Sequence, residues 1–220
     1  MTNPSETART QILDAALGIA AFEGWTSSML REAVSDVGLP DGSEELYFPG
    51  GPLELIRYWA ERCDAQTSAE IAKLNLSEMR IRNKVTAGVI ARLEAIGPND
   101  EAARRAIART ALPDAISMGP KIAWSAADTI WRAIDDKSTD FNFYTKRATL
   151  SAVIGTSMTA WLADNDTDKT KARAFVDARI ENVMQFEKAK FQVKKRISKL
   201  PDPAEILGQM RYGTRRRRRR

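Results

Sequence analysis

The chain has 220 residues, a formal net charge of +5, one cysteine and no histidine. The single cysteine, Cys63, cannot form an internal disulfide, which fits a reducing compartment and excludes cysteine-rich zinc clusters. The lack of histidine excludes Ser-His-Asp and Cys-His catalysis and the histidine-containing di-iron sites of helical bundles. An enzyme built on this chain would have to use carboxylates or lysine.

Hydrophobic residues recur at helical spacing almost throughout, so the sequence predicts one all-α domain. In chain order, we expect helices at about 6–22, 28–36, 43–47, 51–75, 78–96, 100–112, 121–134, 140–163 and 168–198. Pro120 is expected to interrupt the chain before the helix at 121–134, and Asp140 to cap the helix that follows. We expect an N-terminal subdomain at 1–50, a helical core at 51–190 and a C-terminal arm at 191–220.

Charge is divided unevenly along the chain. Residues 187–220 contain thirteen Lys and Arg against three acidic residues, a net charge of +10, which leaves −5 on residues 1–186. We therefore expect an acidic globular part and a basic arm whose final six arginines favour disorder. Anionic membranes and nucleic acid both attract such an arm, and a solvated or solubilising tail is the alternative.

The N-terminal helices follow the order of the helix-turn-helix end of TetR-type regulators, with "LYFPGGPLELI" (46–56) after the predicted recognition helix. Residues 1–62 hold four arginines against ten acidic residues, and the predicted recognition helix offers Asp41, Glu44 and Glu45 with no basic residue. DNA phosphates would be repelled there. The sequence favours a TetR-like fold without DNA binding. A TetR-type regulator that binds DNA and a hydrophobic ligand is the alternative function.

The stretch "STDFNFYTKR" (138–147) places three aromatic residues beside charged ones. Helical spacing puts Phe141 and Tyr144 on one face and Phe143 on another. We expect Phe141 to point inward, and Phe143 with Tyr144 to point outward as anchors of a protein interface. Core packing at the helix start is the alternative.

Four segments together carry a resemblance to a known family: "FEGWTSSMLREAVSDVGLP" (22–40), "LYFPGGPLELI" (46–56), "TIWRAIDDKSTDFNFYTKRATLSAV" (129–153) and "FVDARIENVM" (175–184). They resemble the Coq-nine family of ubiquinone-biosynthesis proteins over most of residues 10–190. The resemblance implies a TetR-like, lipid-binding, non-enzymatic accessory protein that dimerises. It would bind isoprenoid quinone intermediates and present them to the di-iron demethoxyubiquinone hydroxylase. It implies a protein that is peripheral to the membrane. From the residues we expect no catalytic residue, cofactor or metal. Because the N-terminus has neither a signal-peptide nor a presequence pattern, we expect a cytoplasmic location, peripheral on the inner membrane of a bacterial-type cell.

The resemblance also places a hydroxylase-binding patch on this chain. Its expected members are Ile130, Phe143, Tyr144 and Arg147. Phe143 stands where tryptophan is common in the family, so the partner's pocket is expected to differ.

Two further sites are expected from the residues. The small-residue stretch "ATLSAVIGTSMTAWL" (148–162) indicates either close helix packing or a wall that leaves space for an isoprenoid quinone or a phospholipid. The expected lipid-binding residues are Trp124, Trp131, Gly155, Met158 and Trp161. A basic amphipathic pattern predicts membrane contact, or a helix packed on its own domain, with these expected membrane-binding residues: Lys190, Lys194, Lys195, Arg196, Ile197 and Leu200. An enzyme in its own right is the remaining alternative, which no paired-acid or nucleotide-binding motif favours.

Overall fold

The computed structural model describes residues 3–197, together with their side chains except those of residues 140, 141 and 186–197. Within this range all regular elements are helices, so the all-α prediction is confirmed. The α-helices are α1 (Pro4–Glu23), α2 (Ser27–Asp36), α3 (Ser43–Tyr47), α4 (Gly51–Ala72), α5 (Ile81–Glu94), α6 (Asp100–Thr110), α7 (Met118–Ala133), α8 (Asp140–Ala163) and α9 (Thr170–Ile197), with a 3-10 turn at Leu76–Glu78. The chain divides into two compact units, Met1–Ile180 and Glu181–Arg220.

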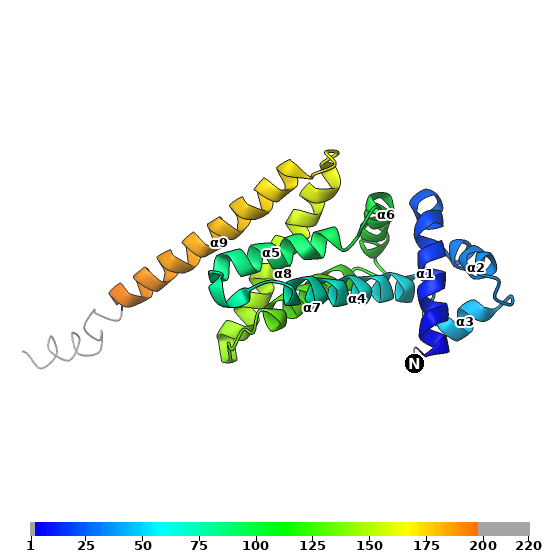
Figure 1. Ribbon diagram of the computed structural model, residues 1–220, viewed down its shortest axis with the longest axis horizontal. Coiled ribbons are helices and arrows are strands. Elements are labelled where there is room, and N and C mark those ends of the chain that lie inside the picture. The colour runs from blue at the N-terminus through cyan, green and yellow to red at the C-terminus, as the bar shows by residue number, and fades with distance from the viewer. Residues whose placement is uncertain (1–2, 198–220) are drawn as a thin grey trace, which may run out of the picture. The chain divides into compact units, whose positions relative to one another are not determined.

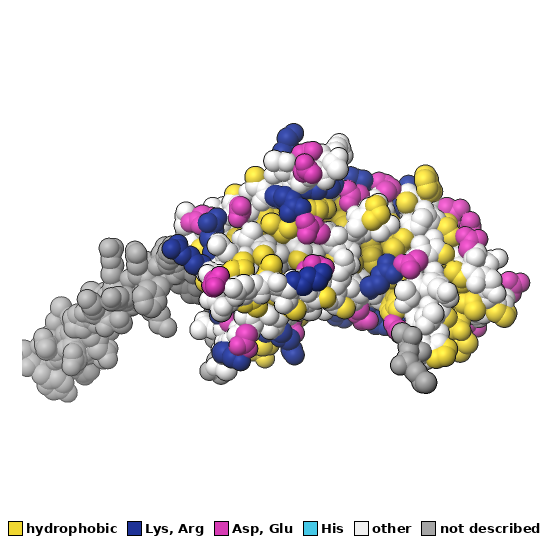
Figure 2. Space-filling view, viewed as in Figure 1, with side chains coloured by type: hydrophobic (Ala, Val, Ile, Leu, Met, Phe, Trp, Pro, Cys, Tyr) yellow, Lys and Arg dark blue, Asp and Glu magenta, His cyan; other side chains and the backbone are white. Residues whose placement is uncertain are grey.

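Helices α1–α3 form a head at the N-terminal end of α4 (Figure 1). Asn3 and Thr26 cap α1 and α2, since their side chains accept the backbone N–H groups of Ser5 and Met29, both at 3.1 Å. Gly24 ends α1 with a φ of 78°, a conformation that glycine adopts without steric cost. In the view of Figure 2, acidic and hydrophobic side chains cover the outer side of the head.

A tryptophan of the head and an arginine of the helical body (α4–α8) both help to hold these two parts together. Trp25 is buried and stacks on Trp59 of α4, with 5.6 Å between the ring centroids. Its indole N–H donates to the carbonyl oxygen of Ala102 in α6 at 3.0 Å. The Arg105 guanidinium also crosses from α6 and donates to the carbonyl oxygen of Ala21 at 2.9 Å. Two body helices therefore hold the head directly.

In the body, α5 and α7 approach each other closely at Gly88. A β-carbon added at Gly88 would lie 2.6 Å from a methyl group of Ile130, so only glycine allows this contact. Ile130 is fully buried there. The expectation that Ile130 belongs to an exposed partner surface is therefore wrong.

The helix limits differ from the prediction at one proline and at one N-cap. Helix α7 begins at Met118, so Pro120 lies in its first turn rather than before it. Proline is tolerated there because first-turn N–H groups have no partner within the helix. Helix α8 begins at Asp140 itself, with Thr139 at the N-cap position. The side chains of Asp140 and Phe141, on which two predictions depend, lie outside the described residues.

Candidate functional site

A cavity of about 280 Å³ in the body, partly open to solvent, is lined by α4, α6, α7 and α8, with two residues from the α5 region. Most of its lining is apolar: Ile56, Trp59, Ile96, Ala106, Ile122 and Ile154 are among the residues that face it. Helix α4 contributes a stripe at helical spacing, Ile56, Trp59, Ala60 and Cys63. A mostly apolar lining suits an apolar ligand.

The polar groups in this lining are engaged by the protein itself. The Thr110 hydroxyl donates to the carbonyl oxygen of Ala106 at 3.0 Å, and the Thr159 hydroxyl to that of Gly155 at 3.3 Å. The Cys63 thiol donates to the carbonyl oxygen of Ala95 at 3.3 Å. Burial raises the pKa of Cys63, so it stays a thiol and is a weak nucleophile.

One charged side chain, Arg92, reaches the cavity wall. It is buried, and its Nε donates to Asp64 Oδ1 at 2.8 Å. The other carboxylate oxygen of Asp64 accepts the Ser125 hydroxyl at 2.9 Å. The charge of Arg92 is thus balanced by a buried carboxylate rather than offered to a ligand.

Two glycines leave the cavity open. A β-carbon added at Gly155 of α8 meets no atom within 4 Å, and one added at Gly119 of α7 meets only the Thr110 hydroxyl, at 3.8 Å. Both glycines line the cavity, as does Met158. The structure therefore places Gly155 and Met158 where a ligand wall was expected.

The three tryptophans expected at this wall lie elsewhere. Trp131 is buried and donates its indole N–H to the carbonyl oxygen of Lys146 at 3.3 Å. Trp161 faces the cations of Lys169 and Arg173, at 5.8 and 5.5 Å from its ring centroid. Trp124 stacks on Tyr144. The tryptophan that does line the cavity is Trp59, and the helical stripe on α4 was the signal that could have indicated it.

A second feature is a row of three aromatic rings on α7 and α8, here called the aromatic ladder: Trp124, Phe143 and Tyr144. The Phe143 and Tyr144 centroids are 5.2 Å apart in an edge-to-face arrangement, and Trp124 stacks on Tyr144 at 6.4 Å. Tyr144 is 63% exposed and Phe143 is half-buried. An exposed tyrosine braced by two rings has the form of an interface anchor.

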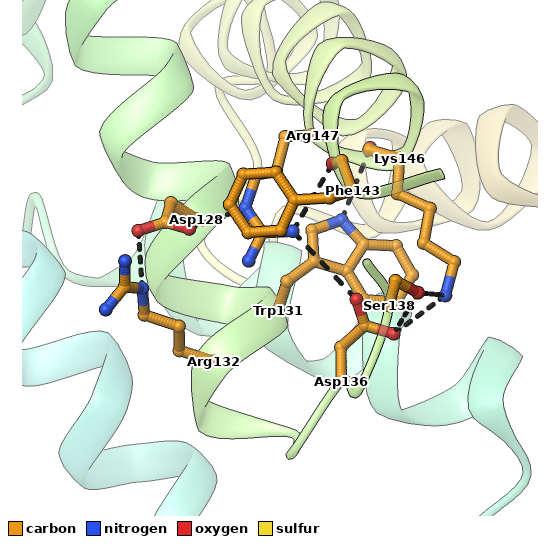
Figure 3. A network of polar contacts seen from close by, with 8 residues as sticks. All are labelled: Asp128, Trp131, Arg132, Asp136, Ser138, Phe143, Lys146 and Arg147. Carbon is orange, nitrogen blue, oxygen red and sulfur yellow. Dashed lines mark hydrogen bonds and ion pairs between the residues drawn. The ribbon is translucent and has the colours of Figure 1, made fainter. Parts of the chain in front are cut away.

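A buried arginine packs against Phe143 of the aromatic ladder (Figure 3). The Arg147 side chain is 3% exposed, and its Nε donates to Asp128 Oδ1 at 2.5 Å. Its guanidinium lies 3.4 Å from the centroid of the Phe143 ring and also reaches Asp136, at 3.9 Å. Arg147 therefore positions Phe143 and is not exposed for direct contact with a partner, so that expectation is wrong.

Asp136 completes this network at the loop between α7 and α8. Burial acts to raise its pKa, but hydrogen bonds from Lys146 (2.7 Å) and Ser138 (2.8 Å), with the charge of Lys146, outweigh this effect. The pKa of Asp136 is therefore lowered and the group is ionised at neutral pH.

The predicted membrane-binding residues, Lys190, Lys194, Lys195, Arg196, Ile197 and Leu200, lie outside the described side chains. Among the described residues, no group of three or more acidic, cysteine or histidine side chains could hold a metal ion. No described helix is long and apolar enough to cross a bilayer.

Comparison with known proteins identifies relatives across most of the chain. The COQ9 family model matches residues 116–187, which contain the aromatic ladder and the α7 and α8 walls of the cavity. The mitochondrial ubiquinone biosynthesis protein COQ9 of Rattus norvegicus is 28% identical over 191 residues, 84% of this chain and 61% of that protein. The probable ubiquinone biosynthesis protein coq9 of Dictyostelium discoideum, also mitochondrial, is 25% identical over 86% of this chain and 64% of its own. The chain thus spans about 60% of the length of these relatives.

A solved structure shares the fold. The TetR transcriptional regulator from Nitrosomonas europaea ATCC 19718 superposes with a TM-score of 0.64 and 18% identity, over 79% of this chain and 95% of that one. At this identity the likeness shows the fold alone. The TetR-like fold predicted from the sequence is confirmed, and the chain is similar to the COQ9 proteins, as the predicted resemblance indicated.

Proposed function

We propose that this protein is a non-enzymatic accessory factor of ubiquinone biosynthesis, which binds an isoprenoid quinone intermediate and presents it to the di-iron hydroxylase that modifies it. The observation that carries the proposal is the apolar cavity in the body. The names of the COQ9 relatives support the pathway.

The cavity favours a long apolar ligand. Its volume of about 280 Å³ is at the lower limit of ordinary ligand pockets, about 300–1,000 Å³. It would accept part of an isoprenoid tail because its lining is mostly apolar. A phospholipid acyl chain has the same chemistry and is the competing occupant.

An accessory role is favoured over catalysis by the state of the polar groups around the cavity. The hydroxyls, the thiol and Arg92 are all engaged by protein atoms. A bound ligand would meet no activated nucleophile or free base among these groups.

Presentation to a partner is supported by the aromatic ladder. Tyr144 is exposed, and rings and the Arg147 network hold it in place, so little conformational freedom is lost when a partner covers it. We further propose a homodimer that is peripheral on the inner membrane, with the basic arm in contact with anionic lipid. These points rest on the resemblance and on the charge of residues 187–220.

The proposal is tested by titrating a short-chain ubiquinone into the full chain and following tryptophan fluorescence, because Trp59 lines the cavity. Gly155→Leu points a side chain into the open space and should weaken binding at least about tenfold, equivalent to ~1.4 kcal/mol. Gly18→Leu is the matched control: it makes the same change at an exposed helical glycine of α1 and should leave affinity unaltered. Equal affinity in Gly155→Leu would place the ligand elsewhere.

A further inference from the structure

The turn that joins α4 to α5, here called the α4–α5 tip (residues 73–84), carries exposed aliphatic side chains. Leu74 and Ile81 are 37% and 45% exposed, and Leu76 and Met79 between them are half-buried. None of the four lines the body cavity. Aliphatic side chains that gather on an exposed turn indicate a surface that contacts something outside the chain.

The α4–α5 tip is also basic. Its formal charge is +3, from four Lys and Arg against one acidic residue, whereas residues 1–186 together carry −5. The rest of that range therefore carries −8. An anionic surface is attracted to the tip and repelled by the net charge of the remainder. The cations of the tip are Lys73, Arg80, Arg82 and Lys84.

Two of these cations are not used by the protein itself. Arg82 pairs with Asp177 at 3.7 Å, and Lys73 with an exposed glutamate one turn earlier at 2.7 Å. Within the part of the chain that the structure describes, the side chains of Arg80 and Lys84 have no hydrogen-bond or ion-pair partner. Both stand at the start of α5, where a cation opposes the helix dipole and does not stabilise the helix. Their charges are therefore available to an anionic group outside the chain.

The backbone of the α4–α5 tip is held by its own hydrogen bonds. The N–H of Leu74 donates to the carbonyl oxygen of Ile71 at 3.0 Å, and the N–H of Met79 donates to that of Leu76 at 3.3 Å. A 3-10 turn at Leu76–Glu78 lies between the two helices. The tip is thus already folded, so little conformational freedom is lost when its side chains make a contact.

An anionic bilayer fits this combination of side chains better than nucleic acid or a protein does. Residues 73–84 contain no aromatic side chain on which a base could stack, and none of the aromatic anchors typical of protein interfaces. Aliphatic side chains enter the boundary between head groups and acyl chains without needing a shaped pocket. Cations beside them meet the negative surface of the cytoplasmic leaflet.

We propose that the α4–α5 tip is a membrane contact of the body, in which Leu74 and Ile81 enter the interface of an anionic bilayer while Arg80 and Lys84 meet lipid phosphates. The head packs at the other end of α4, a helix of 22 residues and about 33 Å (Figure 1). A bilayer docked at the tip is therefore kept away from the acidic head. The inference rests on the proposed peripheral membrane location and adds a surface of the body to the basic arm.

A dye attached at the tip tests this contact separately from that of the basic arm. Leu74→Cys in the full chain accepts a thiol-reactive NBD dye, because the native Cys63 is only 2% exposed. The dye emission should shift to the blue when vesicles of phosphatidylglycerol and phosphatidylcholine are added, and a quencher on the lipid acyl chains should lower it. Phe22→Cys is the matched control: it labels an exposed apolar position in the acidic head and should show no shift.

Charge variants test the cations. The double variant Arg80→Gln, Lys84→Gln should weaken binding to the same vesicles by about fivefold to thirtyfold, as expected for the loss of two cations at an anionic surface. The control Arg31→Gln, Arg57→Gln removes the same charge from exposed positions in the head and the first turns of α4. It should bind within about twofold of the native protein, because salt screens charges that lie beyond the Debye length. Co-sedimentation at physiological ionic strength measures all three.

The outcomes separate this inference from the proposed function. If the chain binds the vesicles while the dye at position 74 stays in water, the inference is overturned and the peripheral location stands. A blue shift that needs no vesicles and grows with protein concentration would show that a second copy covers the tip, which also overturns the inference. If the native chain does not bind the vesicles at all, the proposed peripheral location fails together with the inference.

Discussion

The head and the body of this fold keep their charges in different places. The ion pairs of the head are at its edge with α4: Arg9 with Glu54, and Arg62 with Asp14, whose side chains are 33% and 59% exposed. In the body, by contrast, Arg92 and Arg147 are buried against carboxylates. Arg92 borders the body cavity, and Arg147 packs against Phe143 of the aromatic ladder. Burying a charge costs free energy of folding, so the buried arginines at both candidate sites indicate that the exact positions of these side chains matter there.

The head has a TetR-like architecture with an acidic third helix. The first turn of this helix holds Glu44 and Glu45, and the helix has no basic residue, a charge that repels DNA phosphates. The cavity lies in the body, and no residue of this acidic helix lines it. Matched substitutions in head and body test whether the two regions differ as described.

The largest expected difference is between the arginines. Arg147→Ala leaves Asp128 and Asp136 without their buried cation and should lower the free energy of unfolding by about 3–5 kcal/mol. Arg62→Ala at the head should cost about 1 kcal/mol or less, since that pair is partly exposed. Urea denaturation of both variants measures the contrast.

Arg132 provides a sharper control for the same experiment. It binds the other oxygen of Asp128, at 2.6 Å, but is 73% exposed. Arg132→Ala should therefore resemble Arg62→Ala. Equal losses in Arg132→Ala and Arg147→Ala would mean that burial does not distinguish these pairs.

The second comparison concerns exposed aromatic residues. Tyr144→Ala should weaken binding of the hydroxylase by about 2 kcal/mol, because a braced, exposed ring acts as an anchor. Phe22, which is 82% exposed at the end of α1, is the head counterpart, and Phe22→Ala should leave binding unaltered. Tyr144 is a cleaner probe than Phe143, whose ring covers Arg147. Surface plasmon resonance with the purified hydroxylase measures the affinity of each variant. Unaltered binding by Tyr144→Ala would show that the aromatic ladder is not part of the interface.

The third comparison uses the helical glycines. Gly155→Ala and Gly18→Ala should each raise the free energy of unfolding by about 0.5–1 kcal/mol, since both helices have room for a methyl group. Only Gly155→Ala narrows the cavity, so it alone should weaken ubiquinone binding. Thermal unfolding and ligand titration of the same samples separate the two effects. A loss of affinity in Gly18→Ala would show that ubiquinone binding depends on helix stability and not on the free volume of the cavity.

The smallest expected effect is one of pH. The lowered pKa of Asp136 means that its ionised form stabilises the fold above the unfolded pKa of about 3.9, and that this contribution is lost as the pH falls through the folded value. The stability difference between the native protein and Asp136→Asn should therefore shrink between about pH 5 and pH 2. In the head, Asp14→Asn should differ only slightly from the native protein in free energy of unfolding at neutral pH, because its ion pair with Arg62 is partly exposed. Melting temperatures across this pH range check both, and a constant difference for Asp136→Asn would contradict the network.

Sequence reasoning predicted the helices because apolar spacing depends only on neighbours along the chain. It also placed Gly155 and Met158 at a cavity wall, since small residues are visible in a sequence. It missed Trp59, because the packing of α4 against α5 and α7 decides which of its faces borders the space. It misplaced Ile130, whose burial depends on the close approach that Gly88 permits. Arg147 was misplaced for the same reason, because Asp128 and Asp136 become its neighbours only in the fold.

The most direct test of the account is native mass spectrometry, with lipid extraction, of the protein purified from its own host. The account predicts an isoprenoid quinone that co-purifies with the native chain and with Gly18→Leu, and is lost from Gly155→Leu. A native chain that is empty, or that retains its lipid in Gly155→Leu, would contradict the claim that the body cavity is a quinone site.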